Sequence, residues 1–325
     1  MSRIGLGTWA IGGWMWGGTD EEESIKSINA AVERGVNLID TAPAYGIGRS
    51  EEIVGRAIAE GQLRSRVVIA TKTGLEWKDG KVFRNASCAR ILCEVADSLR
   101  RLRTDYIDIY QVHWPDPLVP IEETAETMQT LFDQGKIRAI GVSNFSVSQI
   151  ERFRRVAKLH VVQPPYNLFE REIEAELLPY CWQSGLATLT YGALCRGLLS
   201  GKLQEDAHFE GDDLRLTDPK FRPPRYAQYL AAVRRLDQFA RDRYGKRVIH
   251  LAVRWILDQG ATTALWGARH PSQLQPIDGV FGWSLDAAAK AEIARILRES
   301  ITDPIGLEFM APPPRRQIAA LQAAQ

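Results

Sequence analysis

The sequence contains few of the residues and spacings that mark metal-binding or disulfide-rich proteins. It has four cysteines in 325 residues, and none of them stands in a CxxC pair. Four cysteines without that spacing are too few for a disulfide framework, so we expect reduced, mostly buried thiols. The five histidines form no HxH or HExxH pair. This absence weighs against a metal-dependent hydrolase and predicts that the protein needs no metal.

Long apolar runs and an excess of one charge are also missing. Every apolar run ends well short of the roughly 20 residues that a transmembrane helix needs. No signal-peptide pattern is visible near the first residues, so we expect a cytoplasmic protein. The 41 basic and 40 acidic residues leave a net charge of +1. This balance gives no indication of a nucleic-acid partner or of binding to a membrane surface.

The most informative pattern in the sequence is an eightfold alternation of short apolar runs with helical segments. The runs span residues 3–9, 36–42, 67–72, 106–114, 137–145, 160–166, 186–194 and 262–268. Residues 20–35 illustrate the helical segments, since they begin with an acidic first turn and end at Gly35. Eight such units predict an α/β protein with one (β/α)8 (TIM) barrel domain over residues 1–325, its core being about residues 3–300. No GxGxxG follows any run, which weighs against an open, doubly wound sheet.

Two segments fall outside this alternation. Residues 197–226 form a long polar connection after the seventh run and contain three prolines, and the next helical pattern begins near Tyr229. A loop of this length is typical of a lid or binding loop, or else of a disordered segment. Residues 301–325 are proline-rich and then alanine-rich, so we expect a C-terminal tail.

Four polar side chains stand where strands of such a barrel would end. Asp40 closes the second run and Tyr45 follows five residues later, whereas Lys72 closes the third run and His113 stands near the end of the fourth. Active sites of these barrels lie at the C-terminal ends of the strands, so we expect the four to converge at one mouth. Each has an ordinary structural explanation when taken alone, such as a turn-forming aspartate or a structural histidine. Together, on three consecutive strands, they favour a catalytic site.

These four side chains suit proton transfer to an oxygen atom. A tyrosine is a weak acid at neutral pH, but an ammonium group within about 4–6 Å lowers the pKa of its hydroxyl. Lys72 can supply that charge, and Asp40 can keep the lysine protonated in a buried place. A neutral His113 could donate a hydrogen bond to a carbonyl oxygen beside Tyr45. The arrangement predicts a general acid aimed at an oxygen that becomes an alkoxide.

Several segments in a fixed order resemble the aldo-keto reductase superfamily over nearly the whole chain. They are "LIDTAPAYG", "ATKTG", "QVHWPD", "GKIRAIGVSNFS", "QPPYNLFER" and "YGALCRGLLSGK". The resemblance implies an oxidoreductase with the tetrad Asp40, Tyr45, Lys72 and His113, in which Tyr45 is the general acid and base. It also implies hydride transfer between a nicotinamide cofactor and a small carbonyl or alcohol, with NADP(H) preferred and NAD(H) as a weaker alternative.

Further segments resemble one branch of that superfamily, the bacterial NADP-dependent glycerol dehydrogenases. They are "GTWAIGGWMWGGTD", "VHWPDPLVPIEET", "GDDLRLTDPKF" and "EFMAPPPR". This likeness implies polyols such as glycerol, together with their aldehydes or ketones, as substrates. The expected partner is therefore a small molecule, and whether the protein is an oligomer stays open.

The resemblance also assigns cofactor-binding and substrate-binding positions. Ser143, Asn144 and Gln163 would contact the nicotinamide carboxamide, the 197–226 loop would cover the pyrophosphate, and Arg269 would face the 2′-phosphate. The full cofactor set is Thr8, Trp9, Ser143, Asn144, Gln163, Tyr191, Gly192, Leu194, Arg196, Gly197, Leu198, Lys202, Gly267, Ala268, Arg269, Ser272 and Gln273. The expected walls of the substrate pocket are Trp9, Trp14, Trp16, Trp77 and Trp114. Trp14 and Trp16 have an alternative role, which is to pack their loop onto the barrel rim or to contact another subunit.

The sequence departs from the family pattern in two places. Pro276 and Ile277 stand where many relatives have an acidic residue and an asparagine beside the adenine, which leaves the preference for NADP over NAD open. The first strand also begins almost at once, where relatives commonly have a hairpin that closes the barrel bottom. A second function stays open as well, because potassium-channel β-subunits of the superfamily use this barrel as a cofactor-sensing regulatory module.

Overall fold

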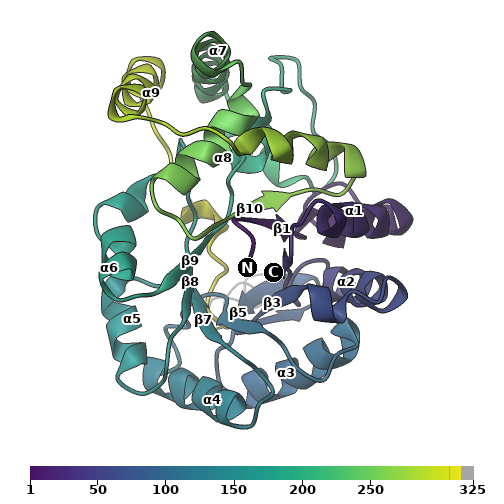
Figure 1. Ribbon diagram of the computed structural model, residues 1–325. Coiled ribbons are helices and arrows are strands. Elements are labelled where there is room, and N and C mark those ends of the chain that lie inside the picture. Colours follow the sequence, from purple (N-terminus) through teal and green to yellow (C-terminus); the bar gives the residue numbers. More distant parts are fainter. Residues whose placement is uncertain (307, 316–325) are drawn as a thin grey trace.

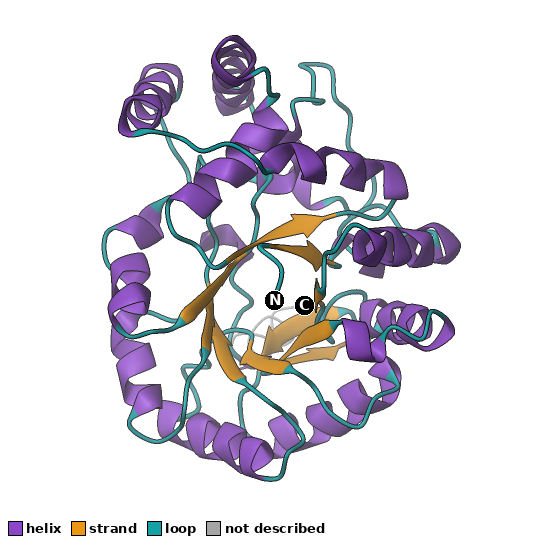
Figure 2. Cartoon of the chain, in the orientation of Figure 1, coloured by secondary structure: helices purple, strands orange, loops and turns teal. Residues whose placement is uncertain are grey.

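The centre of the molecule is a closed barrel of eight parallel strands, as the computed structural model of residues 1–306 and 308–315 shows (Figures 1 and 2). The barrel strands are β1 (Ile4–Gly7), β2 (Leu38–Asp40), β3 (Val68–Thr73), β6 (Ile109–Val112), β7 (Ile140–Ser143), β8 (Val161–Gln163), β9 (Ala187–Thr190) and β10 (Thr263–Gly267). The first strand pairs with both β2 and β10, which closes the ring. The prediction of a (β/α)8 barrel is therefore confirmed. Residues 316–325 of the expected tail lie outside the described residues.

Helices cover the outside of this barrel (Figure 2). They are α1 (Glu21–Glu33), α2 (Arg49–Glu60), α3 (Cys88–Leu102), α4 (Ile121–Asp133), α5 (Val147–Arg154), α6 (Leu177–Gln183), α7 (Arg225–Tyr244), α8 (Val248–Asp258) and α9 (Ala287–Ser300). The acidic start predicted near residue 20 is present, since the Asp20 carboxylate caps α1 by accepting a 3.0 Å hydrogen bond from the backbone of Glu23. No helix in the part of the chain that the structure describes is long and apolar enough to cross a membrane.

The helical pattern near the C-terminal half differs from the expectation in two details. Helix α7 begins at Arg225 instead of near Tyr229, directly after Pro224. The last barrel strand is followed by a 3₁₀ helix, η7 (Pro271–Val280), before α9 begins. Pro276 lies inside η7 and has no N–H to donate, which disfavours a regular α-helix there.

A small antiparallel hairpin extends beyond the C-terminal end of β3 and is missing from the sequence-based prediction. Its strands are β4 (Leu75–Lys78) and β5 (Lys81–Arg84). The turn consists of Asp79 and Gly80, and both have positive φ angles, of 50° and 73°. A two-residue turn of this kind matches the twist of the strands it connects.

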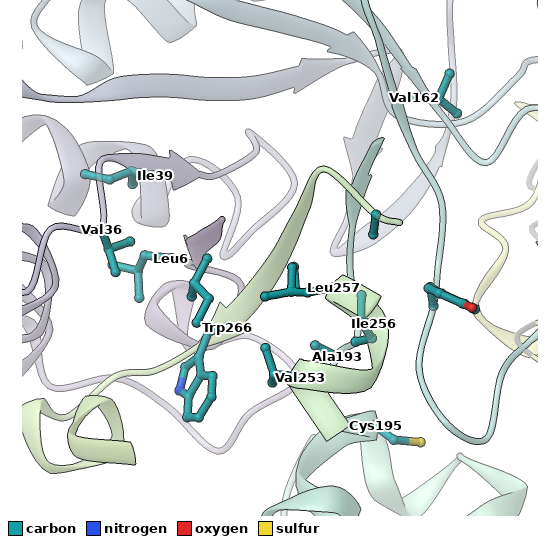
Figure 3. Close-up of a cluster of buried hydrophobic side chains, with 14 of the residues drawn as sticks. Leu6, Val36, Ile39, Val162, Ala193, Cys195, Val253, Ile256, Leu257 and Trp266 are labelled. Atoms are coloured by element: carbon teal, nitrogen blue, oxygen red, sulfur yellow. The ribbon is translucent and has the colours of Figure 1, made fainter. Parts of the chain in front are cut away.

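Two apolar layers hold the barrel and its helices together. Inside the barrel, the buried side chains of Leu38, Ala70, Ile109, Val161, Leu189 and Leu265 form one cluster. Between the barrel and the helices, side chains such as Leu6, Ile39 and Trp266 belong to the larger cluster of Figure 3. Leu38 and Ile39 show the alternation that produces these layers, because neighbouring residues of a strand point to opposite faces. Strand ends are thereby fixed in space, and the site is built on them.

Candidate active site

The four strand-end residues predicted from the sequence meet at the C-terminal mouth of the barrel. The Lys72 ammonium lies 2.6 Å from the Asp40 carboxylate and donates a 3.1 Å hydrogen bond to the Tyr45 hydroxyl. Its third donor reaches the carbonyl of Thr41 at 3.0 Å. The His113 ring stands edge-on to the Tyr45 ring, with 5.8 Å between the ring centroids. A charged lysine thus connects a buried carboxylate to a phenol.

The position of Tyr45 depends on close packing of two backbone segments. Tyr45 lies in the turn after β2, and the 3₁₀ turn η1 (Ala10–Gly12) packs against that turn. A Cβ on Gly12 would lie 2.6 Å from the Tyr45 carbonyl, and a Cβ on Gly46 would lie 2.1 Å from the Gly12 oxygen. Only glycine fits such an approach. Gly12 of the "GTWAIGGWMWGGTD" segment therefore lets this loop pack directly against the backbone of Tyr45.

The charges of these groups follow from burial and from their neighbours. Burial alone would lower the pKa of Lys72, but the contributions of Asp40 and Tyr45 together outweigh burial and raise this pKa, so the ammonium persists. Burial, assisted by Lys72, lowers the pKa of His113 well below its usual value, which leaves a neutral imidazole. The expected lowering of the Tyr45 pKa is wrong in its net direction. Burial raises it more strongly than Lys72 lowers it, because desolvation penalises the phenolate.

The residues expected near the nicotinamide form a hydrogen-bonded chain beside the tetrad. Gln163 donates from its amide nitrogen to Asp40 at 2.7 Å, so this nitrogen orients the carboxylate that pairs with Lys72. The Ser143 hydroxyl donates to the backbone carbonyl oxygen of Gln163 at 2.8 Å. Asn144 donates to the backbone carbonyl of His113 at 3.0 Å and accepts from the Tyr191 hydroxyl at 2.8 Å. Since Asn144 also donates to the Ser143 hydroxyl at 3.0 Å, the chain connects the ends of five barrel strands, β2, β6, β7, β8 and β9, around the mouth.

A cavity of about 330 Å³ opens beside Tyr45 and runs toward the end of β10. The predicted cofactor residues that line it are Thr8, Trp9, Tyr191, Gly192, Leu194, Arg196, Gly197, Lys202, Gly267, Ala268, Arg269 and Gln273. Ser143, Asn144, Gln163, Leu198 and Ser272 are not part of this lining. Leu198 is fully buried in the core, whereas Ser272 is exposed on the surface. Of the tetrad, Asp40 and Tyr45 line the cavity, which joins them to most of the positions expected for a dinucleotide, whereas Lys72 and His113 are not part of its lining.

The five tryptophans expected around the substrate separate into two groups. Trp9 stacks on Tyr45 with 5.9 Å between ring centroids, Trp16 meets Trp9 edge-on at 5.5 Å, and both line the cavity. Trp14, Trp77 and Trp114 do not line it. Trp77 lies on the hairpin strand β4 beneath the guanidinium of Arg90, and Trp114 lies beneath that of Arg84. These cation–π contacts hold both rings to neighbouring arginines.

Two loops meet across the cavity and hold each other in place. One is residues 13–18, and the other is residues 212–215 of the long connection after β9. The Asp212 carboxylate accepts hydrogen bonds from the backbone of Met15 at 2.7 Å and of Gly17 at 3.3 Å. Leu214 donates in return to the Met15 carbonyl at 3.0 Å. The long connection thus has a defined contact with the loop that carries Trp16.

Four cations line the cavity, and three of them have partners in the structure. Arg196 pairs with the buried carboxylates of Glu170 and Asp218, so the protein itself already neutralises the charge of this guanidinium. Arg215 pairs with Asp213 at 2.5 Å. Arg269 donates to the carbonyls of Trp16 at 2.8 Å and of Gly18 at 3.2 Å. The fourth cation, Lys202, has no ion-pair partner among residues 1–306 and 308–315.

Some site residues are absent from the predicted set. Arg215 and Met310 also line the cavity, and Asp212 connects the two loops. All three lie in the segments "GDDLRLTDPKF" and "EFMAPPPR", so the family resemblance held a signal for them. Within the described ranges, no group of three or more histidine, cysteine, aspartate or glutamate side chains could hold a metal ion.

Comparisons with known proteins show which proteins this chain is similar to. A family model described as "Aldo/keto reductase family" matches residues 3–298. "Aldo-keto reductase YhdN" of Bacillus subtilis (strain 168) is 63% identical over 318 residues, which cover 98% of this chain and 96% of that protein. The "NADH-specific methylglyoxal reductase" of Escherichia coli (strain K12) is 36% identical over 316 residues, covering 91% of this chain and 96% of that protein.

Two solved structures share the fold and much of the sequence. The glycerol dehydrogenase AKR11B4 from Gluconobacter oxydans has a TM-score of 0.86 and 53% identity, and the match covers 96% of each chain. An aldo-keto reductase from Klebsiella pneumoniae in complex with NADP and acetate has a TM-score of 0.70 and 26% identity, covering 97% of this chain and 93% of that one.

Proposed function

Because this chain belongs to the aldo-keto reductase family, we propose that it transfers hydride between NADP(H) and small carbonyl or alcohol compounds. In this proposal it reduces aldehydes and ketones and oxidises polyols such as glycerol, with Tyr45 as the general acid and base. The observation that carries the proposal is the Tyr45 hydroxyl at the cavity wall, hydrogen-bonded to a lysine that Asp40 keeps charged. The likeness to a glycerol dehydrogenase supports the polyol substrate.

The cavity fits a long anionic ligand that approaches the backbone closely. Gly7, Gly192, Gly197 and Gly267 all contribute to its lining. A Cβ placed on Gly267 would meet no atom within 4 Å, so that position is open to a ligand. Lys202 and Arg269 add positive charge along the same wall. These residues would hold the dinucleotide, and a bound nicotinamide would supply or accept the hydride.

The side chains of the tetrad then handle the proton and the substrate oxygen. In reduction, Tyr45 gives its proton to the oxygen that becomes an alkoxide. The Lys72 ammonium, 3.1 Å from the hydroxyl, stabilises the phenolate that remains. His113 is neutral, so one of its ring nitrogens can donate a hydrogen bond to the same oxygen. Alcohol oxidation uses these steps in reverse, with the Tyr45 phenolate as the base.

Initial rates on the purified protein test the proposal. We expect turnover of glyceraldehyde with NADPH, slower turnover with NADH, oxidation of glycerol with NADP⁺, and unchanged rates after exhaustive chelation of metals. Absence of turnover with either cofactor would refute the enzyme assignment. Tight cofactor binding without turnover would instead favour the cofactor-sensing regulatory module.

The preference between NADP(H) and NAD(H) can be tested at Arg269. One relative is named as NADH-specific, whereas a solved relative contains NADP. Pro276 lines the cavity and Ile277 is buried, so neither offers a charged contact to an adenosine. We expect Arg269→Ala to raise the KM for NADPH about tenfold or more and to change the KM for NADH little, because a charge-assisted contact to the 2′-phosphate is lost. Equal effects on both would mean that Arg269 does not contact this phosphate.

Gly267 offers a test of the cofactor position that does not depend on charge. Its φ is not in the positive range, and the open space around it accepts a side chain without contact inside the protein. We expect Gly267→Val to leave Tm unchanged while weakening nucleotide binding about 10–10²-fold, because the branched side chain occupies the ligand's place. Gly267→Ala is the matched control and should show a smaller effect, measured by quenching of tryptophan fluorescence. Wild-type affinity in the valine variant would contradict this placement.

A further inference from the structure

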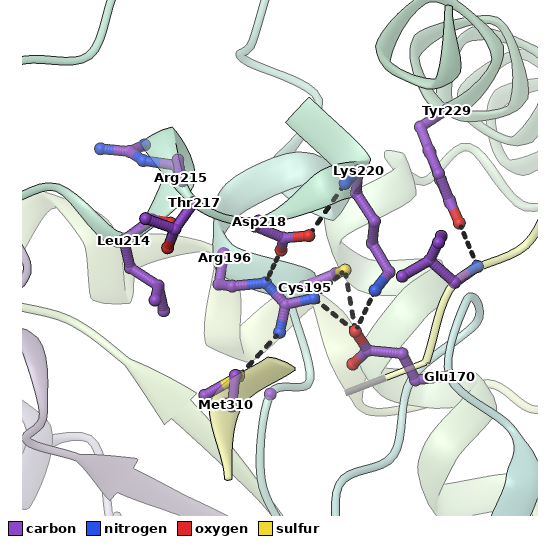
Figure 4. Close-up of polar contacts among 12 residues, drawn as sticks. Glu170, Cys195, Arg196, Leu214, Arg215, Thr217, Asp218, Lys220, Tyr229 and Met310 are labelled. Carbon is purple, nitrogen blue, oxygen red and sulfur yellow. Dashed lines mark hydrogen bonds and ion pairs between the residues drawn. The ribbon is translucent and has the colours of Figure 1, made fainter. Parts of the chain in front are cut away.

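A buried network of four charged side chains lies behind one wall of the cavity (Figure 4). Glu170, Asp218 and Lys220 are fully buried, and Arg196 is 8% exposed. Glu170 forms ion pairs with both cations, at 2.9 Å from Lys220, and Arg196 pairs in addition with Asp218 at 2.5 Å. Two carboxylates and two cations thus neutralise one another in the protein interior.

The network keeps its charges because its members support each other. Burial raises the pKa of Glu170, but Arg196 and Lys220 outweigh this effect and hold it below the usual value. Buried ion pairs of this kind contribute little net stability compared with apolar residues of the same volume. A role in positioning explains the arrangement better than a role in stability alone.

The segment that the network holds has an uncommon backbone conformation. Cys195, Arg196 and Gly197 are consecutive and have φ angles of 44°, 52° and 96°. The first two have side chains and are therefore strained in this left-handed region. Arg196 and Gly197 line the cavity, so the kink forms part of its wall. The ion pairs of the Arg196 side chain with Glu170 and Asp218 hold the backbone of Arg196 in this conformation.

The N-terminal end of this wall, at Gly192, is also connected to the Glu170 carboxylate. Asn167 donates from its amide nitrogen to Glu170 at 2.6 Å and to the Gly192 carbonyl at 2.9 Å. Gly192 lines the cavity next to Tyr191. Both ends of residues 192–197 are therefore connected to Glu170, one through Asn167 and the other through Arg196.

Lys220 extends the network to the C-terminal segment. Its ammonium donates to the Gly306 carbonyl at 3.1 Å, and the Arg196 guanidinium contacts the Met310 sulfur at 3.9 Å (Figure 4). Met310 also lines the cavity. A single carboxylate thus lies at the centre of contacts that set two parts of the cavity wall.

We propose that Glu170 is a positioning residue that, through Asn167, Arg196 and Lys220, holds residues 192–197 and the C-terminal segment in the shape that binds the dinucleotide. This inference rests on the proposed function, because it concerns the same cofactor. Glu170 does not touch the reacting atoms, so its loss should affect cofactor affinity far more than the chemical step.

The test compares nucleotide binding in two variants that weaken the protein at opposite ends of the barrel. Glu170→Gln keeps the shape of the side chain and removes its charge. Asp108→Asn is the matched control. Asp108 directly precedes β6, away from the cavity, and forms a 2.8 Å ion pair with the largely buried Arg64. Because unpaired cations in the first variant hinder folding, the double variant Glu170→Gln, Lys220→Met restores charge balance and keeps the Arg196–Asp218 pair.

Binding of NADPH is measured by fluorescence quenching, together with Tm and the separate values of kcat and KM. We expect the two Glu170 variants to bind NADPH about 10–10²-fold more weakly, with kcat at saturating cofactor close to that of the wild type. The Asp108 variant should have a lower Tm and the wild-type affinity for NADPH. Wild-type affinity in the Glu170 variants would overturn the inference alone, whereas a wild-type protein that binds neither NADPH nor NADH would overturn the proposed function with it.

Discussion

Replacing Tyr45 by phenylalanine is expected to lower kcat in both directions by about 10²–10⁴-fold, which is the usual contribution of a positioned general acid or base. The Tyr45 hydroxyl accepts a 3.1 Å hydrogen bond from Lys72 at the cavity wall, and the substitution removes only this oxygen. The ring keeps its place against Trp9, which stacks on it. Cofactor affinity should therefore stay near the wild-type value.

A second tyrosine supplies the control for this experiment. Tyr110 is fully buried on β6 and does not line the cavity, so Tyr110→Phe makes the same chemical change away from the site. We expect near-normal kcat in that variant, measured by loss of NADPH absorbance with glyceraldehyde. Retained turnover in Tyr45→Phe would mean that another group donates the proton, and the assignment of Tyr45 would be wrong.

The fold was predictable from the sequence because the hydrophobic periodicity agrees with the signals for helix starts and ends along most of the chain. Seven barrel strands fall inside the predicted apolar runs, β3 extends one residue past its run to Thr73, and Asp20 caps α1 as the acidic first turn indicates. The hairpin of β4 and β5 is missing from the prediction, although the Asp79–Gly80 pair between two alternating segments is a strong hairpin signal. The early start of α7 was harder to predict, because Pro223 and Pro224 suggest a loop.

The positions of site residues were easier to predict than their electrostatics. Strand ends bring Asp40, Lys72 and His113 together by topology alone, so their convergence follows from the fold. The net pKa direction of Tyr45 depends on how deeply the phenol is buried, which no spacing in the sequence reveals. The same holds for Arg196, whose partners Glu170 and Asp218 come from distant segments.

Replacing Lys72 by methionine is expected to lower the rates of reduction and of oxidation. It should also shift the pH profile of the oxidation rate to higher pH. Burial already raises the pKa of Tyr45, and Lys72 is the group that lowers it. Without that ammonium the pKa rises further, so the phenolate fraction at a given pH falls. Oxidation of glycerol, which needs the phenolate, should therefore keep rising to higher pH in the variant than in the wild type. Reduction falls as well, because the equilibrium constant of the reaction is unchanged and the phenol is a weaker acid.

The loss of Lys72 also leaves the Asp40 carboxylate buried without a cation, and this costs about 3–5 kcal/mol of stability. Folding and chemistry are separated by the double variant Lys72→Met, Asp40→Asn. An asparagine oxygen can still accept the hydrogen bond from Gln163, and no buried charge remains. We expect Tm to recover in the double variant while kcat stays low and the pH profile stays shifted. If activity recovers together with Tm, Lys72 acts only by supporting the structure, and its electrostatic role at Tyr45 is wrong.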